Sequence, residues 1–266
     1  MKFTNNNNFP SNINKLLNEK IYITENIGMS QSKILIFEDM VLKIEPNILE
    51  SQNEIKIMKW IENNKYFPKL IINEIFKKKS YLIMTRIKGK MACDEIYMNN
   101  GDILIKALVD GLKFLWNFNI TNCPFIQTVD DKIKQIEIKI NKGLININNI
   151  NLDFFFEEKF ENVKELFNWL INHRTKEEFV LSHGDYCLPN IFIENNIFSG
   201  FVDIGKLGIA DKWLDLAICY RSLKYNIEGK YNGKKYNIDP NLLFIKLDIK
   251  PNWDKIKFYI LLDELL

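Results

Sequence analysis

The chain has 266 residues, of which 47% are apolar and 26% are charged, and its formal net charge is +2. This apolar content is enough for a packed core, and the near-neutral charge excludes the strongly basic surface of a nucleic-acid-binding protein. No apolar run is long enough to cross a membrane, and residues 1–15 lack the apolar core of a secretory signal. We therefore expect a cytoplasmic protein that binds neither nucleic acid nor a membrane.

The cysteines and histidines exclude a zinc site of the usual kind. Only two histidines are present, and the four cysteines are scattered without a C-x-x-C pair. We expect the thiols to be reduced and mostly buried, with no disulfide-linked dimer. The chain is accordingly expected to be a monomer or a weak homodimer.

The first third of the chain is expected to be rich in β-structure. Segments of β-branched and aromatic residues, separated by polar turns, predict antiparallel strands. The predicted strands are 22–24, 33–37, 40–44, 69–76 and 81–85. Two helices accompany them: a short amphipathic helix at 12–20, and one at 48–63 whose apolar residues recur on a single face.

The rest of the chain is expected to be mainly helical. Helical spacing of apolar residues predicts helices at 103–118, 132–140, 157–169, 210–223 and 253–265. Short strands are predicted at 179–181, 191–194 and 200–202, and an Asn-rich loop at 143–152. This order of elements predicts an α+β fold with a β-rich N-terminal lobe at 1–88 and a mainly helical C-terminal lobe at 89–266. Segment 86–90 is the predicted hinge.

The stretch 182–203 carries the most informative chemistry. Asp185 and Asn190 lie five residues apart, and Asp203 follows on the next predicted strand. Phosphoryl transfer needs one carboxylate to orient the attacking hydroxyl, and a carboxamide and a second carboxylate to hold Mg²⁺. The sequences His-Gly-Asp and Asp-x-Gly are each typical of ordinary turns. In this order and at this spacing, however, they match the catalytic and metal-binding segments of protein kinases.

Two charged residues of the first lobe extend this pattern. Lys43 ends a predicted strand, as the phosphate-binding lysine of kinases does, and Glu54 lies on the following helix where it can pair with it. An exposed charge is the alternative for any single lysine in so lysine-rich a chain. The loop 28–32 lies where a phosphate-covering loop belongs, but with one glycine it is also consistent with an ordinary hairpin turn.

On these residues the chain resembles the aminoglycoside 3′-phosphotransferases, bacterial antibiotic-resistance enzymes with a two-lobed, protein-kinase-like fold. The resemblance is closest at 183–191, 199–206, 210–217, 250–253 and 259–266, and looser at 28–30, Lys43, Glu54 and Trp60. The terminal Leu-Leu-Asp-Glu-Leu is its most family-specific part. The resemblance implies that the 1–88 lobe binds the nucleotide, whereas the 89–266 lobe is catalytic and binds the substrate.

The resemblance also implies a role for each site residue. Asp185 would be the catalytic base or the hydroxyl-orienting residue, and Asn190 and Asp203 would bind Mg²⁺. Lys43, held by Glu54, would contact the α- and β-phosphates of ATP. The remaining nucleotide contacts would come from the backbone: the amides of Met29 and Ser30 over the phosphates, and Thr85 and Ile87 beside adenine.

The substrate would be recognised by acids, because aminoglycosides are polycations. Asp263, Glu264 and the carboxylate of Leu266 cluster at the C-terminus, and we expect little positive charge near them. Asp153, Glu157 and Glu158 are expected to form a second acidic wall. A solvated loop and helix start is the alternative for these acids, because acids favour the first turn of a helix.

The leading functional hypothesis is ATP-dependent phosphorylation of the 3′-hydroxyl of kanamycin- or neomycin-type aminoglycosides, which confers resistance. One alternative is a metabolic kinase of the same fold that acts on choline, a hydroxylated amino acid or a sugar. A second is a non-catalytic, nucleotide-binding pseudokinase. A pseudokinase would have lost at least one of four residues, and all four are present: Lys43, Asp185, Asn190 and Asp203.

Overall fold

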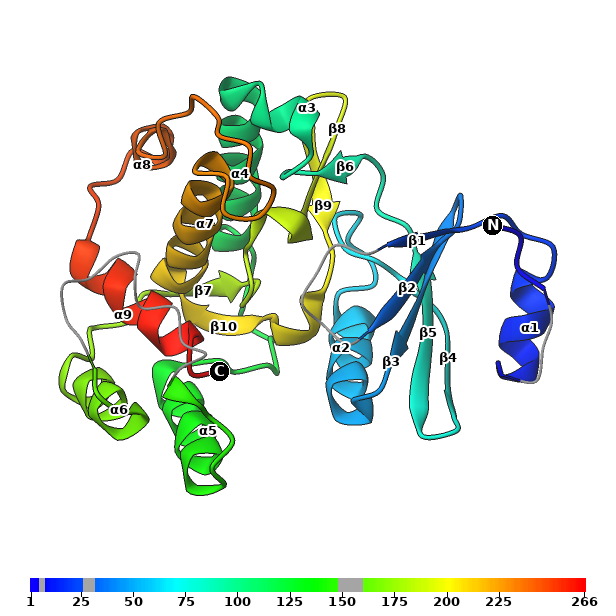
Figure 1. Cartoon of the computed structure of the whole chain (residues 1–266), viewed down its shortest axis with the longest axis horizontal. Coiled ribbons are helices and arrows are strands. Elements are labelled where there is room, and N and C mark those ends of the chain that lie inside the picture. The colour runs from blue at the N-terminus through cyan, green and yellow to red at the C-terminus, as the bar shows by residue number, and fades with distance from the viewer. Residues whose placement is uncertain (5–7, 26–31, 148–159) are drawn as a thin grey trace. The chain divides into compact units, whose positions relative to one another are not determined.

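The computed structural model describes residues 1–4, 8–25, 32–147 and 160–266 (Figure 1). By its internal contacts the chain divides into two compact units. The first comprises Met1–Met91 and Pro189–Lys206, and the second comprises Ala92–Leu188 and Leu207–Leu266. Residues 189–206 thus return to the first unit, whereas we predicted one boundary, after residue 88. The first unit is built on β-sheet and the second mainly on helices, so the predicted α+β class is confirmed.

A five-stranded antiparallel sheet forms the centre of the first unit. Its strands are β1 (Ile23–Glu25), β2 (Lys33–Ile36), β3 (Met40–Glu45), β4 (Leu70–Phe76) and β5 (Lys79–Thr85), in the order β1-β2-β3-β5-β4. Burial alternates over the first part of β3, where Met40 and Leu42 are buried and Val41 and Lys43 are less so, as expected for an extended strand. The register pairs Lys43 on β3 with Leu82 on β5. Lys43 is therefore carried by an interior strand of the sheet.

Two helices pack on this sheet. α1 (Ser11–Leu17) buries Ile13 and Leu17 in a core cluster that includes Leu35 and Leu42 of the sheet. α2 (Ile48–Trp60) is capped by the preceding residue, Asn47, whose side chain accepts hydrogen bonds from two amides of the first turn. The Ser51 hydroxyl of α2 lies 2.6 Å from the Ser80 hydroxyl of β5, and both are buried. This contact fixes α2 against the sheet.

A second, three-stranded sheet completes the first unit. Its strands are β6 (Lys90–Met91), β8 (Ile191–Glu194) and β9 (Ile197–Phe201), in the order β6-β8-β9. Single turns flank this hairpin, η2 (Leu188–Asn190) before β8 and η3 (Ile204–Lys206) after β9. The segment 86–90, predicted as a hinge, packs within this unit: the Ser199 hydroxyl donates to the Lys88 carbonyl at 2.8 Å, and Lys90 pairs with Ile193.

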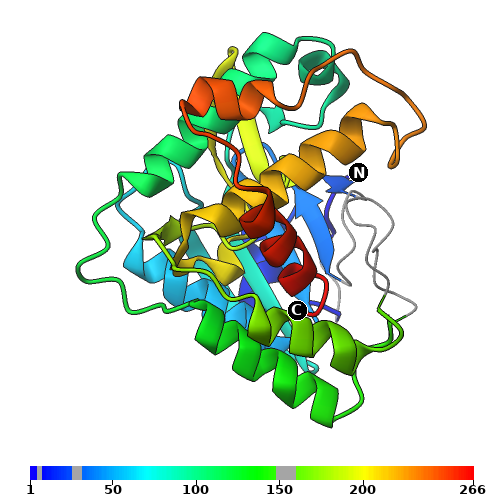
Figure 2. The same cartoon turned by 90° about the vertical axis from the view of Figure 1, so that its left-hand side faces the viewer.

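The second unit is mainly helical. Its helices are α3 (Glu95–Met98), α4 (Gly101–Trp116), α5 (Val129–Asn141), α6 (Val163–Asn172), α7 (Lys212–Ile227), α8 (Leu242–Leu247) and α9 (Trp253–Asp263). Helix α7 is buried on nearly all sides and packs against α9, which also contacts α6 (Figure 2). No helix in the described part of the chain is long and apolar enough to span a membrane.

A two-stranded sheet of β7 (Phe179–Ser182) and β10 (Gly208–Asp211) lies beside these helices. β10 was not predicted, because we expected the helix to begin at Ala210. The Asp211 side chain instead caps α7 by accepting a hydrogen bond from the Trp213 amide, so the helix begins at Lys212. Helices α3 and α8 were also missed, since four and six residues are too few to show an apolar period.

Gly89 provides a test of how the predicted hinge is packed. Its φ is +97°, and a Cβ added there would lie 2.2 Å from the Ile193 carbonyl oxygen. We expect Gly89→Ala to lower the free energy of unfolding by about 3 kcal/mol, because it adds a backbone clash to an unfavourable φ. Gly143→Ala is the control: its φ is also positive, at +64°, but nothing lies within 4 Å of an added Cβ. Equal losses in chemical denaturation of the two variants would contradict the packed arrangement of residues 86–90.

Candidate active site

Lys43 joins three segments of the first unit. Its Nζ lies 2.9 Å from Glu54 Oε2 on α2 and 2.9 Å from Asp203 Oδ1, which follows β9. The Glu54 side chain is buried, whereas the Asp203 side chain is 49% exposed. Burial pulls the pKa of Lys43 down, but attraction to the two carboxylates outweighs it and raises the pKa above its usual value. Lys43 is therefore a fixed cation held between one buried and one accessible carboxylate.

Backbone contacts place Asp203 at this position. The Val202 amide donates to the Asn190 carbonyl at 3.0 Å, which ties the strand before Asp203 to the segment that carries Asn190. On the far side, the Asn53 side-chain amide of α2 donates to the Gly205 carbonyl at 2.6 Å. Asp203 itself has a φ of 56°, in the left-handed region that aspartate tolerates better than most residues. The structure thus brings Lys43, Glu54 and Asp203 together and places the Asn190 backbone beside them.

The predicted adenine contacts differ in their availability. The Thr85 amide donates to the Lys69 carbonyl at 2.9 Å, and its hydroxyl accepts from the Lys69 amide at 2.8 Å. Ile87 is buried, and its backbone has no hydrogen bond to any of the described residues. Ile87 is thus better suited than the Thr85 amide to bind a base. Met29 and Ser30 lie outside the described residues.

The loop that carries Asp185 is braced from within the second unit. Asp215 of α7 accepts two hydrogen bonds from this loop, from the His183 amide at 2.7 Å and from the Gly184 amide at 2.9 Å. The Asp185 amide donates to His183 Nδ1 at 3.3 Å. Burial raises the pKa of Asp215, and the hydrogen bonds from the two amides oppose that rise. These contacts fix the backbone on the N-terminal side of Asp185.

Two further side chains hold the same loop. The Ser222 hydroxyl of α7 accepts from the Leu188 amide at 3.0 Å, and the buried Tyr186 hydroxyl donates to the Leu108 carbonyl of α4 at 2.7 Å. Asp215 and Ser222 are seven residues apart, so they lie on one face of α7. The sequence pattern did not predict that Asp215 or Ser222 would hold the loop of Asp185. A usable signal was present, since Asp215 is a lone acid within the apolar stretch 213–219.

The C-terminal acids have basic partners, which corrects one prediction. We expected little positive charge near Asp263, Glu264 and Leu266. Instead, the Arg221 guanidinium of α7 forms ion pairs with both Asp263 and Glu264, the latter at 2.9 Å. The Lys139 ammonium of α5 contacts the Leu266 carbonyl oxygen. The prediction of little positive charge is wrong because it considered only charges near in the sequence, whereas α5 and α7 bring cations from far away in the chain.

The predicted second acidic wall cannot be placed, because Asp153, Glu157 and Glu158 lie outside the described residues. Within the described residues, no group of three or more His, Cys, Asp or Glu side chains gathers as a metal site would require. A metal ion at Asn190 and Asp203 would therefore take its other ligands from bound phosphates and water.

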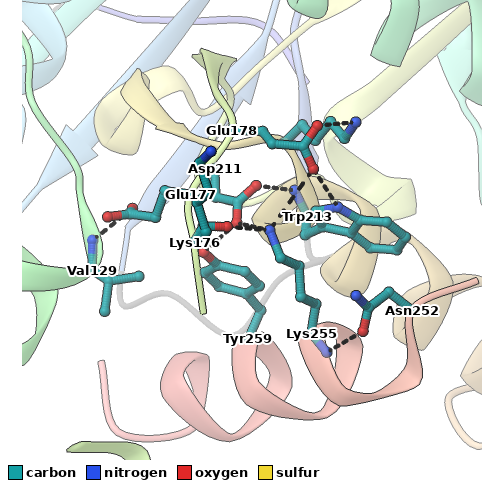
Figure 3. Close-up of polar contacts among 10 residues, drawn as sticks. Val129, Lys176, Glu177, Glu178, Asp211, Trp213, Asn252, Lys255 and Tyr259 are labelled. Atoms are coloured by element: carbon teal, nitrogen blue, oxygen red, sulfur yellow. Dashed lines mark hydrogen bonds and ion pairs between the residues drawn. The ribbon is translucent and has the colours of Figure 1, made fainter. Parts of the chain in front are cut away.

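A buried polar cluster anchors the start of α9 (Figure 3). The fully buried Asp211 accepts hydrogen bonds from Lys255 Nζ and from the Tyr259 hydroxyl, both at 2.8 Å. Lys255 Nζ also donates to the Lys176 carbonyl at 2.5 Å. Burial, together with the charge of Asp211, raises the pKa of Tyr259, so its hydroxyl keeps its proton and acts as a donor. Glu178 links the rim of the cluster to Lys212 and Trp213.

Comparison with known proteins identifies the family. A model of the phosphotransferase enzyme family matches residues 27–234. An aminoglycoside 3′-phosphotransferase of Enterococcus faecalis is 30% identical over 264 residues, which cover 95% of this chain and 96% of the relative. The chain belongs to the aminoglycoside 3′-phosphotransferase family. Another member with this name, from Staphylococcus aureus, is 29% identical over 95% of this chain and 96% of its own.

Solved structures support the fold of this aminoglycoside 3′-phosphotransferase family member. An aminoglycoside 3′-phosphotransferase of type VIII superimposes with a TM-score of 0.75 at 18% identity and covers 93% of this chain and 94% of its own. An aminoglycoside phosphotransferase of Streptomyces rimosus, solved with ADP and streptomycin, has a TM-score of 0.71 at 18% identity over 92% of each chain. The predicted family, the protein-kinase-like fold and the class of enzyme, a phosphotransferase acting on hydroxyl groups, are all confirmed.

The cluster around Asp211 predicts how strongly α9 is anchored. We expect Lys255→Met to lower the free energy of unfolding by about 3–5 kcal/mol, because it leaves the Asp211 carboxylate buried without its cation. Lys212→Met is the matched control, since Lys212 pairs with the half-exposed Glu178 and should cost at most about 1 kcal/mol. Thermal and urea unfolding of both variants measure the difference. Similar losses for the two lysines would show that burial of the pair contributes nothing.

Proposed function

We propose that this chain transfers the γ-phosphoryl group of ATP to the 3′-hydroxyl of kanamycin- or neomycin-type aminoglycosides and so confers resistance to them. The observation that carries this proposal is the 30% identity to an aminoglycoside 3′-phosphotransferase over nearly the full length of both chains. The ion pairs of Lys43 with Glu54 and Asp203 support it, because they assemble the nucleotide-binding residues that a pseudokinase would have lost.

The nucleotide would be held by the first unit. Lys43 is a fixed cation, and its charge would offset that of the α- and β-phosphates, while Glu54 keeps its side chain in place. The backbone of Ile87 would hydrogen-bond to adenine, with the Thr85 carbonyl as a further candidate. The amides of Met29 and Ser30 would cover the phosphates.

Asn190 and Asp203 fit Mg²⁺. Both offer oxygen atoms, the hard ligands that this ion prefers, and one backbone hydrogen bond joins the segments that carry them. The Asp203 carboxylate is half-exposed and lies beside Lys43, so it would be accessible to a metal ion close to the proposed phosphate-binding lysine. When bound, Mg²⁺ would neutralise the negative charge that develops on the phosphates.

Asp185 would orient the 3′-hydroxyl and accept its proton. Its loop is fixed by Asp215, Ser222 and Tyr186, so the carboxylate is held in place before the substrate arrives. Such positioning is a large part of catalysis when the transition state is loose and the enzyme forms no covalent intermediate. Asp263 and Glu264, ordered by Arg221, would receive ammonium groups of the substrate together with the carboxylate of Leu266 and the acids Asp153 and Glu157. We propose a cytoplasmic monomer or weak homodimer.

Turnover with three acceptors tests this function. A coupled assay of ADP release should show MgATP-dependent activity with kanamycin and none with a 3′-deoxy aminoglycoside, because the latter lacks the attacking hydroxyl. Choline is the third acceptor, and it tests the metabolic-kinase alternative. Activity with choline alone, or equal activity with both aminoglycosides, would contradict the proposed substrate or position.

Asp185→Asn tests the proposed catalytic residue. The variant keeps the size of the side chain but cannot accept the hydroxyl proton, so we expect kcat to fall by roughly 10²- to 10⁴-fold. Because Asp185 belongs to the second unit and the nucleotide residues to the first, ATP affinity should change little. Titration with ATP and thermal unfolding serve as controls for binding and folding. Full activity in the variant would remove Asp185 from the catalytic role.

A further inference from the structure

A tyrosine is exposed close to the proposed acceptor site of the second unit. Tyr231 lies in the turn 229–236 that follows α7, and 63% of it is accessible to solvent. A single exposed aromatic residue needs no explanation by itself. Its ordered backbone and its neighbours, however, set Tyr231 apart from an ordinary surface residue.

Hydrogen bonds fix the turn that presents Tyr231. The Lys230 amide donates to the Tyr225 carbonyl at 3.0 Å, and the Tyr236 amide donates to the Ile227 carbonyl at 2.9 Å, so both sides of the turn are tied to α7. Within the turn, the Gly233 amide donates to the Gly229 carbonyl at 2.8 Å. The ring of Tyr231 is therefore presented by a braced segment.

The ring of Tyr231 lies against Tyr225 of α7. Their ring centroids are 6.0 Å apart, and the planes meet at 66°, an edge-to-face contact. Tyr225 is buried, and the Lys230 ammonium covers its ring at 4.1 Å from the centroid. Of this aromatic pair, Tyr231 is thus the member with ring surface open to a ligand.

Tyr231 is also within electrostatic reach of the proposed acceptor site. Tyr225 lies one helical turn beyond Arg221, the residue that pairs with the C-terminal acids. Ser222, the residue after Arg221, holds the loop of Asp185. Partial desolvation raises the pKa of the Tyr231 phenol although the residue is largely exposed, and the charge of Arg221 opposes that rise. The nearby acids, Glu264 and Asp185 among them, raise it further.

We propose that the ring of Tyr231 forms one wall of the acceptor site and binds an ammonium-bearing sugar ring of the substrate by stacking and cation–π contact. This inference rests on the proposed function, because it assigns a specificity-determining residue to the same acceptor site. It adds an aromatic contact to the acids that we assigned from the sequence.

The chemistry of the site favours an aminosugar over other ligands. The face of an aromatic ring attracts ammonium groups, and the C–H face of a sugar ring packs on it. The acids beside the ring then hydrogen-bond to the ammonium groups that point away from it. A neutral sugar would gain only the stacking contact, and an anionic ligand would be repelled by Asp263 and Glu264 where Arg221 does not offset them.

The ring and the hydroxyl of Tyr231 can be separated by substitution. We expect Tyr231→Leu to raise the KM for kanamycin by about 3- to 10-fold and to leave kcat and the KM for ATP within 2-fold, because it removes one exposed aromatic contact. Tyr231→Phe and Tyr231→Trp keep a ring and should retain the KM of the unsubstituted chain. Phe179→Leu is the matched control, since it removes a ring that is 51% exposed elsewhere on the second unit.

Each outcome separates this proposal from the proposed function. If the unsubstituted chain phosphorylates kanamycin but Tyr231→Leu leaves its KM unchanged, the aromatic wall is wrong and the function stands. If Tyr231→Phe raises the KM as much as Tyr231→Leu does, the hydroxyl and not the ring makes the contact, and the proposal is overturned. If the unsubstituted chain does not turn over kanamycin, the proposed function fails. Calorimetric titration with kanamycin then tests the wall directly, and the absence of a Tyr231-dependent change in affinity overturns it.

Discussion

The first unit depends on the position of one cation, Lys43, between a buried and an accessible carboxylate. Removing either acid would leave the partly desolvated Lys43 ammonium with only one carboxylate partner. The resulting loss of stability would be larger than that from breaking a surface ion pair. The contact joins β3, α2 and the segment after β9, and Asp203 is 160 residues from Lys43 in the sequence. The same contact therefore joins three segments of the first unit and sets the proposed phosphate-binding charge beside a proposed metal-binding oxygen.

Helix α7 has the corresponding role in the second unit. Asp215 and Ser222 fix the backbone around Asp185, while Arg221 holds the acids at the end of α9. α9 is anchored at its start as well, where Lys255 reaches the buried Asp211 that caps α7. Because one helix positions both the proposed catalytic loop and the proposed substrate acids, a change in its packing would disturb both at once.

Sequence patterns predicted those features that depend on local spacing. The pairing of Lys43 with Glu54 was predicted because Lys43 lies on a strand that is followed by the helix of Glu54. The loop of Asp185 was predicted from its kinase-like order of residues. Features that depend on distant partners were missed or mistaken. Arg221 pairs with acids 42 and 43 residues away in the chain, and no local period reveals those contacts. β10 was hidden because its last residue, Asp211, both pairs in the sheet and caps the helix.

The pairing of the C-terminal acids bears on how the proposed acceptor site would select its substrate. Arg221 and Lys139 offset much of the negative charge of Asp263, Glu264 and the chain terminus, so net charge alone would attract a cation only weakly. The carboxylates are instead ordered and partly desolvated, and ordered acceptors favour ligands that bring N–H donors in matching positions. Aminoglycosides carry several such ammonium groups, whereas the quaternary ammonium of choline has no N–H to donate. In the proposed acceptor site, the basic partners would thus make the acids more selective for an aminosugar than an unpaired acidic cluster would be.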